Sequence, residues 1–148
     1  ARGTIRMVDI SVKKFSLRSA KASVKVVAPS SVIKKIRYGK LPKGEALSAA
    51  KVAGFLAVKN TPNLIPLCHP LQCTHVDIDF KFAVNNLTIL AIAKARYATG
   101  VEMEALTACA LAALTVYDMA KTESQSIVIT DLKLLEKTGG KSGAYRAR

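Results

Sequence analysis

One stretch of the chain combines helix-forming residues with an almost continuous apolar surface. Residues 99–121 are rich in Ala, Leu, Met and Glu and, after the opening Thr-Gly, contain no further Gly or Pro. This composition predicts a helix of about twenty residues, roughly 30 Å long. Because apolar side chains occur around nearly its whole circumference, we expect it to be buried. Its charges stand at the two ends, Glu102 and Glu104 at the start and Asp118 and Lys121 at the finish.

Two interpretations of this helix are open. Glu104 and Asp118 fall on one stripe about 80° wide, which also holds Ala108, Leu111 and Thr115. The helix is either a core element with solvated, charged ends or a scaffold that delivers carboxylates and a lysine into a functional site.

Alternation of apolar and polar residues predicts four strands. The clearest is 75–84, where Val, Ile and Phe alternate with His, Asp and Lys, so that Phe80 and Phe82 belong to the core face. Asn85-Asn86 suits a tight turn into a second strand. The other strands are expected at residues 87–97, 23–28 and 126–135.

The remaining segments complete the order β-α-α-β-β-α-β. A short helical turn is predicted at 32–38, a loop at 39–44 and a helix at 45–59. Pro62, Pro66 and Pro70 are expected to exclude regular structure from the segment that follows. We expect an irregular arm at 1–20 and a flexible basic tail at 136–148.

This order predicts the fold class. It is typical of an α+β, ferredoxin-like sandwich, in which one antiparallel sheet is covered by helices on one face. No repeat or composition break marks a second domain, so residues 1–148 are interpreted as one domain.

Composition limits the kinds of partner and the cellular compartment that are expected for the protein. The net charge is +13, and residues 1–43 hold twelve Lys or Arg against one acid, Asp9, which favours a polyanionic or phosphorylated partner. The odd count of three cysteines argues against a disulfide framework and favours a reducing, cytoplasmic setting. Lys51 and Lys59 interrupt the most apolar early segment, and we expect neither a membrane span nor a secretory leader.

Three motifs are weak signals. Cys68, His69, Cys73 and His75 lie close together, but no CxxC or HxxxH pair is present, so we predict no metal site. The GGKSG string at 139–143 lacks the first glycine of a Walker A loop and the helix that follows one. An RNA-binding sheet needs aromatic side chains for base stacking, and the chain has no such pattern. His69, between prolines, remains a candidate for proton transfer.

Longer strings carry a specific resemblance. GEALSAAKVAGFLAVKNTPNLIPLCHPL at 44–71 and TGVEMEALTACALAALTVYDMAK at 99–121 resemble two signatures of the molybdenum cofactor biosynthesis protein C family, the cyclic pyranopterin monophosphate synthases. MVDIS at 7–11, the Lys-Gly pair at 43–44 and GGKSG match in order and spacing. The resemblance implies an α+β fold, dimers assembled into a hexamer, and active sites at the dimer interface.

The resemblance also implies a reaction and a set of residues. The family is a lyase that converts 3′,8-cyclo-7,8-dihydroguanosine triphosphate to cyclic pyranopterin monophosphate and releases pyrophosphate. It implies no required cofactor, with Mg²⁺ possible on the triphosphate, and no nucleic-acid or membrane partner. The implied catalytic residues are Lys43, Asp118 and Lys121. The implied substrate-binding residues are Asp9, His69, Glu102, Glu104, Lys137 and Lys141.

The residue types suit this chemistry. Proton transfers and a triphosphate require a tuned acid or base and positive charge, and Lys121, partly buried and held by Asp118 three residues earlier, is the candidate for the first. Lys43 would stabilise phosphate charge. Ala98 stands where we expect relatives to carry a lysine, which leaves open whether Arg96 or Lys94 replaces one phosphate contact.

Helix geometry adds one hypothesis and one alternative. Glu104 and Asp118 are fourteen residues apart, or about 21 Å along the axis, so one pocket in one chain would not use both. An antiparallel two-fold interface would bring Glu104 of one chain towards Asp118 and Lys121 of the other. The competing function is a basic nucleic-acid-binding module, whose affinity would fall steeply with salt.

Overall fold

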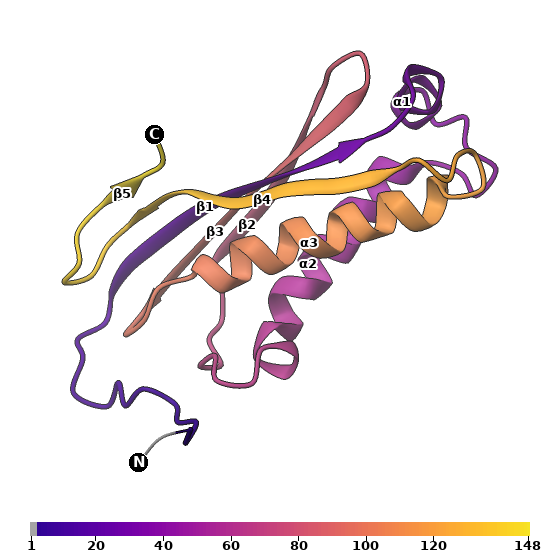
Figure 1. Ribbon diagram of the computed structural model, residues 1–148. Coiled ribbons are helices and arrows are strands. Elements are labelled where there is room, and N and C mark those ends of the chain that lie inside the picture. The colour runs from indigo at the N-terminus through magenta and orange to yellow at the C-terminus, as the bar shows by residue number, and fades with distance from the viewer. Residues whose placement is uncertain (1–2) are drawn as a thin grey trace.

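The computed structural model describes residues 3–148 as one sheet and three helices (Figure 1). The elements are β1 (Ser16–Val27), α1 (Ser30–Arg37), α2 (Ala46–Leu64), β2 (His75–Phe82), β3 (Asn86–Tyr97), α3 (Glu102–Ala120), β4 (Val128–Thr138) and β5 (Tyr145–Arg146). The predicted order of elements is therefore confirmed, with one short strand added at the end.

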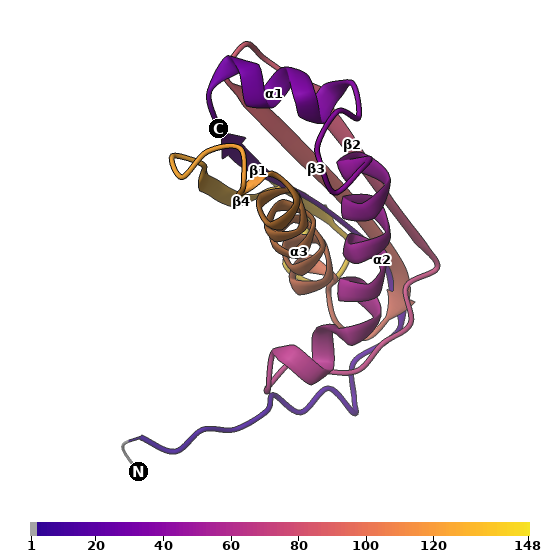
Figure 2. The same cartoon turned by 90° about the vertical axis from the view of Figure 1, so that its right-hand side faces the viewer.

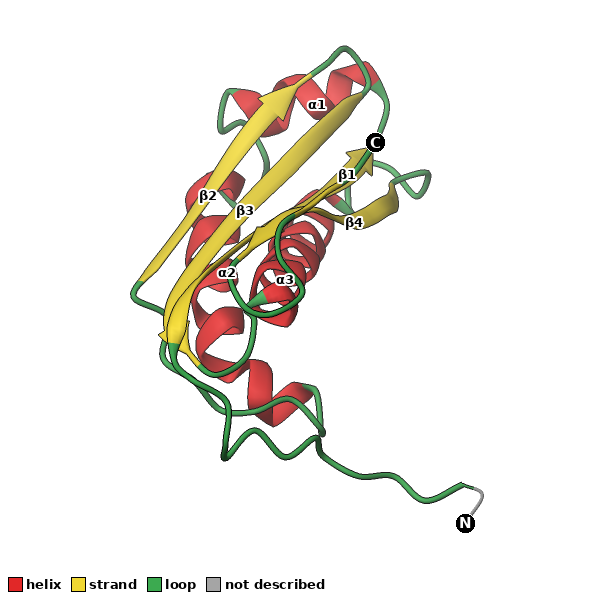
Figure 3. Ribbon diagram, turned by 90° about the vertical axis from the view of Figure 1, so that its left-hand side faces the viewer, coloured by secondary structure: helices red, strands yellow, loops and turns green. Residues whose placement is uncertain are grey.

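The sheet is antiparallel throughout, in the order β2-β3-β1-β4-β5. The first four strands in this order have the arrangement of a ferredoxin-like sandwich, which confirms the predicted fold class. The helices cover one face of the sheet and leave the other open (Figure 3). On β3, Leu87, Ile89 and Ala91 face the helices and are buried. The core thus lies between one face of the sheet and the helix layer.

The first strand is longer than predicted, so the irregular arm expected at 1–20 is wrong for its last residues. β1 begins at Ser16, opposite Tyr97 of β3. Its inward positions include Ala20 and Ala22, which are fully buried. The period of two is present in the sequence, but Ala and Ser have low strand propensity, so long-range pairing decides this strand.

The second helix runs past Pro62 to Leu64, and the prediction that the prolines exclude regular structure is wrong at this position. A proline inside a helix removes one N–H and crowds the carbonyl group four residues earlier. Here it lies in the last turn, so the missing N–H and the crowding at the Val58 carbonyl disturb only the end of the helix. Figure 2 shows the end of α2 leaving the axis of its earlier turns, as a proline kink predicts.

The C-terminal segment is also more regular than predicted. β4 continues to Thr138, and β5 pairs with it, Tyr145 opposite Lys137 and Arg146 opposite Glu136. Between the two strands the backbone adopts positive φ at Gly139, Gly140 and Gly143. These glycines let the chain turn back on itself, and this part of the predicted flexible tail is a hairpin.

Gly139 is expected to be required for this turn. Its φ is +96°, and a Cβ atom there would lie 2.2 Å from the carbonyl oxygen of Leu17. We expect Gly139→Ala to lower the free energy of unfolding by about 2–3 kcal/mol, since backbone strain and a backbone clash add together. Gly143→Ala is the matched control, because its φ is +70° with nothing within 4 Å of the added atom. Urea melts at equal protein concentration measure both, and equal losses would contradict the close approach to Leu17.

The long helix α3 is the centre of the core. Along the predicted stripe, Glu104 and Ala108 are buried, Thr115 is half-buried and Asp118 is exposed, so the stripe leaves the core towards its C-terminal end. By length and composition α3 would also suffice for a membrane span, which the sequence interpretation overlooked. It instead packs beside α2 and against β1, β3 and β4, with 56% of the apolar window buried inside the fold. α3 is therefore a core helix here.

Candidate active site

Three predicted catalytic residues meet at the C-terminal end of α3. The Lys43 ammonium lies 3.0 Å from Oδ2 of Asp118 and donates to the Asp118 carbonyl oxygen at 3.2 Å. Lys121 lies 2.9 Å from Oδ1 of the same carboxylate, three residues along the chain. One carboxylate therefore holds two lysines, which come from segments more than seventy residues apart.

The electrostatics of this Lys43–Asp118–Lys121 cluster follow from its contacts. The neighbouring ammonium groups, Lys121 first and then Lys43, hold the pKa of Asp118 below its usual range. Asp118 therefore stays ionised at neutral pH and fixes both lysines. The partial burial predicted for Lys121 is not present within one chain, because its side chain is 53% exposed.

The loop that presents Lys43 is fixed at both ends. A bridge joins Leu41 to Gly44, and Gly44 has a φ of +108°. Glu45 then caps α2 by accepting hydrogen bonds from the backbone N–H groups of Leu47 and Ser48, both at 2.8 Å. Helix capping thus anchors this loop against the end of α3.

A second group of predicted residues lies at the opposite, N-terminal end of α3. A cavity of about 370 Å³ opens there, between the N-terminal arm, the loop after α2 and the first turn of α3. It is lined by Val8, Ile10, Lys13, Ile65, Leu67, Cys68, His69, Thr99, Gly100, Glu102 and Met103. We call it the α3 N-terminal cavity.

Polar contacts tie the arm and the tail to this cavity. His69 Nε2 lies 2.6 Å from the carbonyl oxygen of Val8, and Asp9 accepts a hydrogen bond from the Ser11 N–H at 2.9 Å. That hydrogen bond, with a smaller effect from the charge of His69, lowers the pKa of Asp9. Lys137 of β4 forms an ion pair with Glu102 at 3.3 Å. The N-terminal arm, the loop after α2, the first turn of α3 and β4 therefore converge on this cavity.

Glu104 lies behind the wall of the cavity. It is only 2% exposed, and its Oε1 accepts a hydrogen bond from the Cys68 thiol at 3.9 Å. Its Oε2 has no partner among the described residues. Burial, reinforced by the charge of Glu102, raises the pKa of this carboxyl group. Within one chain, Glu104 is therefore not exposed to the cavity, although a substrate-binding role was predicted for it.

A basic cavity of about 580 Å³ lies beside the first one and shares Lys13 with it. Four of its eight lining residues are lysine or arginine, and the lining is Val12, Lys13, Lys14, Ser16, Arg18, Gly140, Lys141 and Ser142. Arg18 reaches from β1 to the carbonyl oxygen of Ala98 at 3.2 Å, while its Nε has no partner among the described residues. The cavity therefore offers positive charge to an anion.

The structure shows where the cations near Ala98 lie. Lys94 and Arg96 alternate with the buried Ala93 and Ala95, so they lie on the open face of the sheet, away from the helices. The cation that reaches the Ala98 region from the helix-covered side is Arg18.

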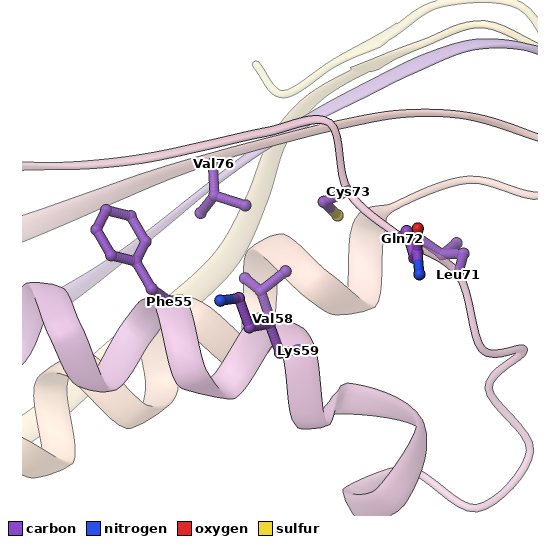
Figure 4. A pocket seen from close by; sticks show the side chains of 7 residues that line it. All are labelled: Phe55, Val58, Lys59, Leu71, Gln72, Cys73 and Val76. Carbon is purple, nitrogen blue, oxygen red and sulfur yellow. The ribbon is translucent and has the colours of Figure 1, made fainter.

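A larger cavity, of about 620 Å³, lies elsewhere and contains none of the predicted site residues (Figure 4). It lies between α2 and the start of β2, and its lining is Phe55, Val58, Lys59, Leu71, Gln72, Cys73 and Val76. Burial, followed by the charge of Glu104, raises the pKa of Cys73 to about 11. At neutral pH this thiol is therefore a weak nucleophile.

We expect the protein to fold without zinc. Within residues 3–148, no three His, Cys, Asp or Glu side chains gather as a metal site would require. After a chelator wash, the melting temperature is expected to stay unchanged. Stoichiometric zinc by elemental analysis, together with unfolding when it is removed, would contradict this expectation.

The predicted site residues thus form two groups within one chain. Lys43, Asp118 and Lys121 are in contact at one end of α3, whereas Glu102, Glu104, His69, Asp9 and Lys137 gather at the other. Lys141 lines the adjacent basic cavity. The sequence did not single out Lys13 or Arg18, and Cys68 was weighed only as a metal ligand. For Arg18 a signal was present: it stands two residues before Ala20, so on a strand both side chains point to the same, helix-covered side.

Comparisons with known proteins identify a family and its named members. The MoaC family model matches residues 7–140. A cyclic pyranopterin monophosphate synthase of Streptomyces avermitilis is 50% identical over 143 residues, which cover 97% of this chain and 84% of that protein. Proteins with the same name from Desulfitobacterium hafniense and Parvibaculum lavamentivorans are each 46% identical and cover 97% and 99% of this chain, and 88% and 93% of their own lengths.

Proposed function

The chain belongs to the MoaC family, and from this we propose that it is a cyclic pyranopterin monophosphate synthase of molybdenum cofactor biosynthesis. It is an enzyme of the lyase type, acting on 3′,8-cyclo-7,8-dihydroguanosine triphosphate. The products are cyclic pyranopterin monophosphate and pyrophosphate.

The observation that carries the proposal is the Lys43–Asp118–Lys121 cluster. Closing a cyclic phosphate requires a hydroxyl group to lose its proton, to attack the α-phosphorus, and to displace pyrophosphate as the leaving group. The carboxylate of Asp118 holds two ammonium groups side by side at 3.0 and 2.9 Å. One lysine can exchange the proton while the other stabilises charge on the phosphate.

The two cavities at the other end of α3 support a nucleotide-derived substrate. The α3 N-terminal cavity supplies His69, Glu102 and neighbouring polar groups for a ring rich in N–H donors. The basic cavity beside it supplies Lys14, Arg18 and Lys141 for phosphate oxygens. We propose that Mg²⁺, if it takes part, binds the triphosphate rather than a protein site.

The separation of the two groups supports a site composed from two chains. Glu104 and Asp118 are about 21 Å apart along α3, so a single small molecule does not span them on one helix. Leu114 is 53% exposed, and with the half-buried Leu106, Ala110 and Tyr117 it forms an apolar stripe along α3. We propose that a second copy covers this stripe in antiparallel fashion and that dimers assemble into a hexamer, a trimer of dimers.

The setting follows from the same proposal. The substrate is a small triphosphate and the buried helix α3 is part of the core, so we place the enzyme in the cytoplasm with no membrane or nucleic-acid partner. The excess of positive charge then serves the triphosphate rather than a polymer.

Mass spectrometry of the product tests the function directly. The protein is incubated with 3′,8-cyclo-7,8-dihydroguanosine triphosphate, and the masses of cyclic pyranopterin monophosphate and pyrophosphate are expected to appear in equal amounts. Unchanged substrate, or simple phosphate release without the cyclic product, would overturn the proposal.

A further inference from the structure

The first helix and the residues around it carry charge of one sign only. Residues 28–44, which include α1, contain five Lys or Arg and no Asp or Glu. Lys35 is paired with Glu123. Lys34, Arg37 and Lys40 are exposed and form no ion pair within residues 3–148. Because unpaired cations on one short segment repel one another, an anion placed among them gains free energy.

These charges border a cavity with apolar and aromatic walls. α1 lies across the end of the sheet at which β2 turns into β3 (Figure 2), and a cavity of about 340 Å³ lies between α1 and that turn. Its wall includes charged groups of Lys34 and Arg37 and apolar surface of Tyr38, Phe82 and Val84, and we call these five residues the α1 surface. Tyr38 is 65% exposed and Val84 is 80% exposed. The surface thus offers positive charge and apolar contact side by side.

Arg37 is already ordered by its aromatic neighbours. Its guanidinium carbon lies 5.7 Å from the ring centre of Tyr38 and 5.6 Å from that of Phe82, which is within cation–π distance. Among the described arginines, polar side-chain contacts are formed by Arg18 and Arg146 and not by Arg37. A guanidinium against aromatic rings keeps N–H groups along its edge, where a carboxylate can accept two of them. Because the side chain is held beforehand, less entropy is lost when a carboxylate binds.

A second copy of this chain is a poor source of those carboxylates. The chain has ten Asp and Glu, and nine of them are buried or already bonded to a lysine, an arginine or a backbone N–H group. Within residues 3–148, Asp79 alone has no such partner. The net charge of +13 also makes two copies repel one another.

We propose that the α1 surface docks an acidic segment of a different protein, in which carboxylates stand on both sides of an aliphatic side chain. Arg37 and Lys34 bind the carboxylates, and the aliphatic side chain lies against Tyr38 and Val84. A nucleic-acid backbone would use the cations but has no group for the apolar wall. The proposal is independent of the proposed function, because none of these residues belongs to the candidate active site.

Fluorescence anisotropy with a labelled peptide of sequence EDLEELDE tests the proposal on the whole protein, in salt of about 0.15 M. Arg37→Glu is expected to weaken binding by about tenfold or more, because it replaces attraction by repulsion. Lys94→Glu is the matched control, since Lys94 is exposed on the open face of the sheet, and it is expected to weaken binding by about twofold or less. Circular dichroism checks that both variants are folded.

A second pair of measurements tests the apolar contact. Val84→Ser is expected to weaken binding of EDLEELDE by about threefold. It is expected to leave unchanged the weaker binding of EDSEESDE, in which serine replaces both leucines. The exposure of Val84 makes this variant safe for the fold.

Four outcomes would overturn the proposal. The protein does not bind EDLEELDE measurably, or it binds both peptides equally, in which case the apolar wall contributes nothing. Equal losses for Arg37→Glu and Lys94→Glu would show a response to net charge alone. Tighter binding of labelled oligothymidylate, weakened by the same variants, would assign the surface to nucleic acid. A synthase assay keeps the two proposals separate, since Arg37→Glu is expected to retain the activity of the parent protein.

Discussion

Lys43→Ala is expected to lower turnover by two orders of magnitude or more, about 3 kcal/mol in activation free energy, while the protein stays folded. The Lys43 side chain is 43% exposed, and its contacts are a carboxylate and a carbonyl oxygen at the end of α3. Its removal leaves no cavity and no unpaired buried group, because Asp118 keeps Lys121 as a partner. A loss confined to activity would thus assign Lys43 to the chemistry.

Lys40→Ala provides the matched control for this prediction. Lys40 lies in the same loop, is exposed, and forms no ion pair among residues 3–148. Its removal changes the net charge by the same amount and is expected to leave turnover near that of the parent. Steady-state rates and circular dichroism melts compare the two variants. Near-normal turnover for Lys43→Ala, or equal losses for both, would reduce Lys43 to a surface charge.

Patterns of hydrophobicity predicted the elements that carry a strong period, and failed where distant contacts decide. β2 was predicted because Val, Ile and Phe alternate with polar residues along it. α3 was predicted because Ala and Leu, both strong helix formers, occur around its whole circumference. The first half of β1 was missed because Ala20 and Ala22 have a low intrinsic preference for strands. They are held in the strand by pairing with β3, which lies far away in the sequence. Pro62 and the hairpin after Gly139 were missed for a similar reason, since each depends on its position relative to an element's end.

The candidate site was predicted unevenly. The contact of Lys121 with Asp118 follows from helical spacing alone, whereas the contact of both with Lys43 comes from the fold. The inaccessibility of Glu104 was not predictable, because helical spacing gives the direction of a side chain and not the depth of its neighbours. Arg18 and Cys68 come from segments joined only by the fold, so no single motif could reveal that they border neighbouring cavities.

Mixing two inactive variants is expected to restore activity if the site is composed from two chains. Glu104→Ala removes a side chain from the N-terminal end of α3. Lys121→Ala removes one just after its C-terminal end, seventeen residues further on, or about 25 Å along the axis. In a heterodimer with the proposed interface, one site carries both lesions and the other carries neither. Random exchange of subunits should therefore restore about a quarter of the sites, measured as cyclic product formed by the mixture.

The control pair for this experiment comes from one end of the helix. Lys43→Ala and Lys121→Ala both alter the Lys43–Asp118–Lys121 cluster, which the structure shows assembled within a single chain. Every site of their heterodimer would carry one lesion, so mixing is expected to restore nothing. Subunit exchange is verified by native mass spectrometry of differently labelled chains, and the fold of Glu104→Ala by its melting curve. Suppose that the mixture of Glu104→Ala and Lys121→Ala also restores nothing although exchange is complete. In that case each site does not take Glu104 from one chain and Lys121 from the other, and the composite site is wrong.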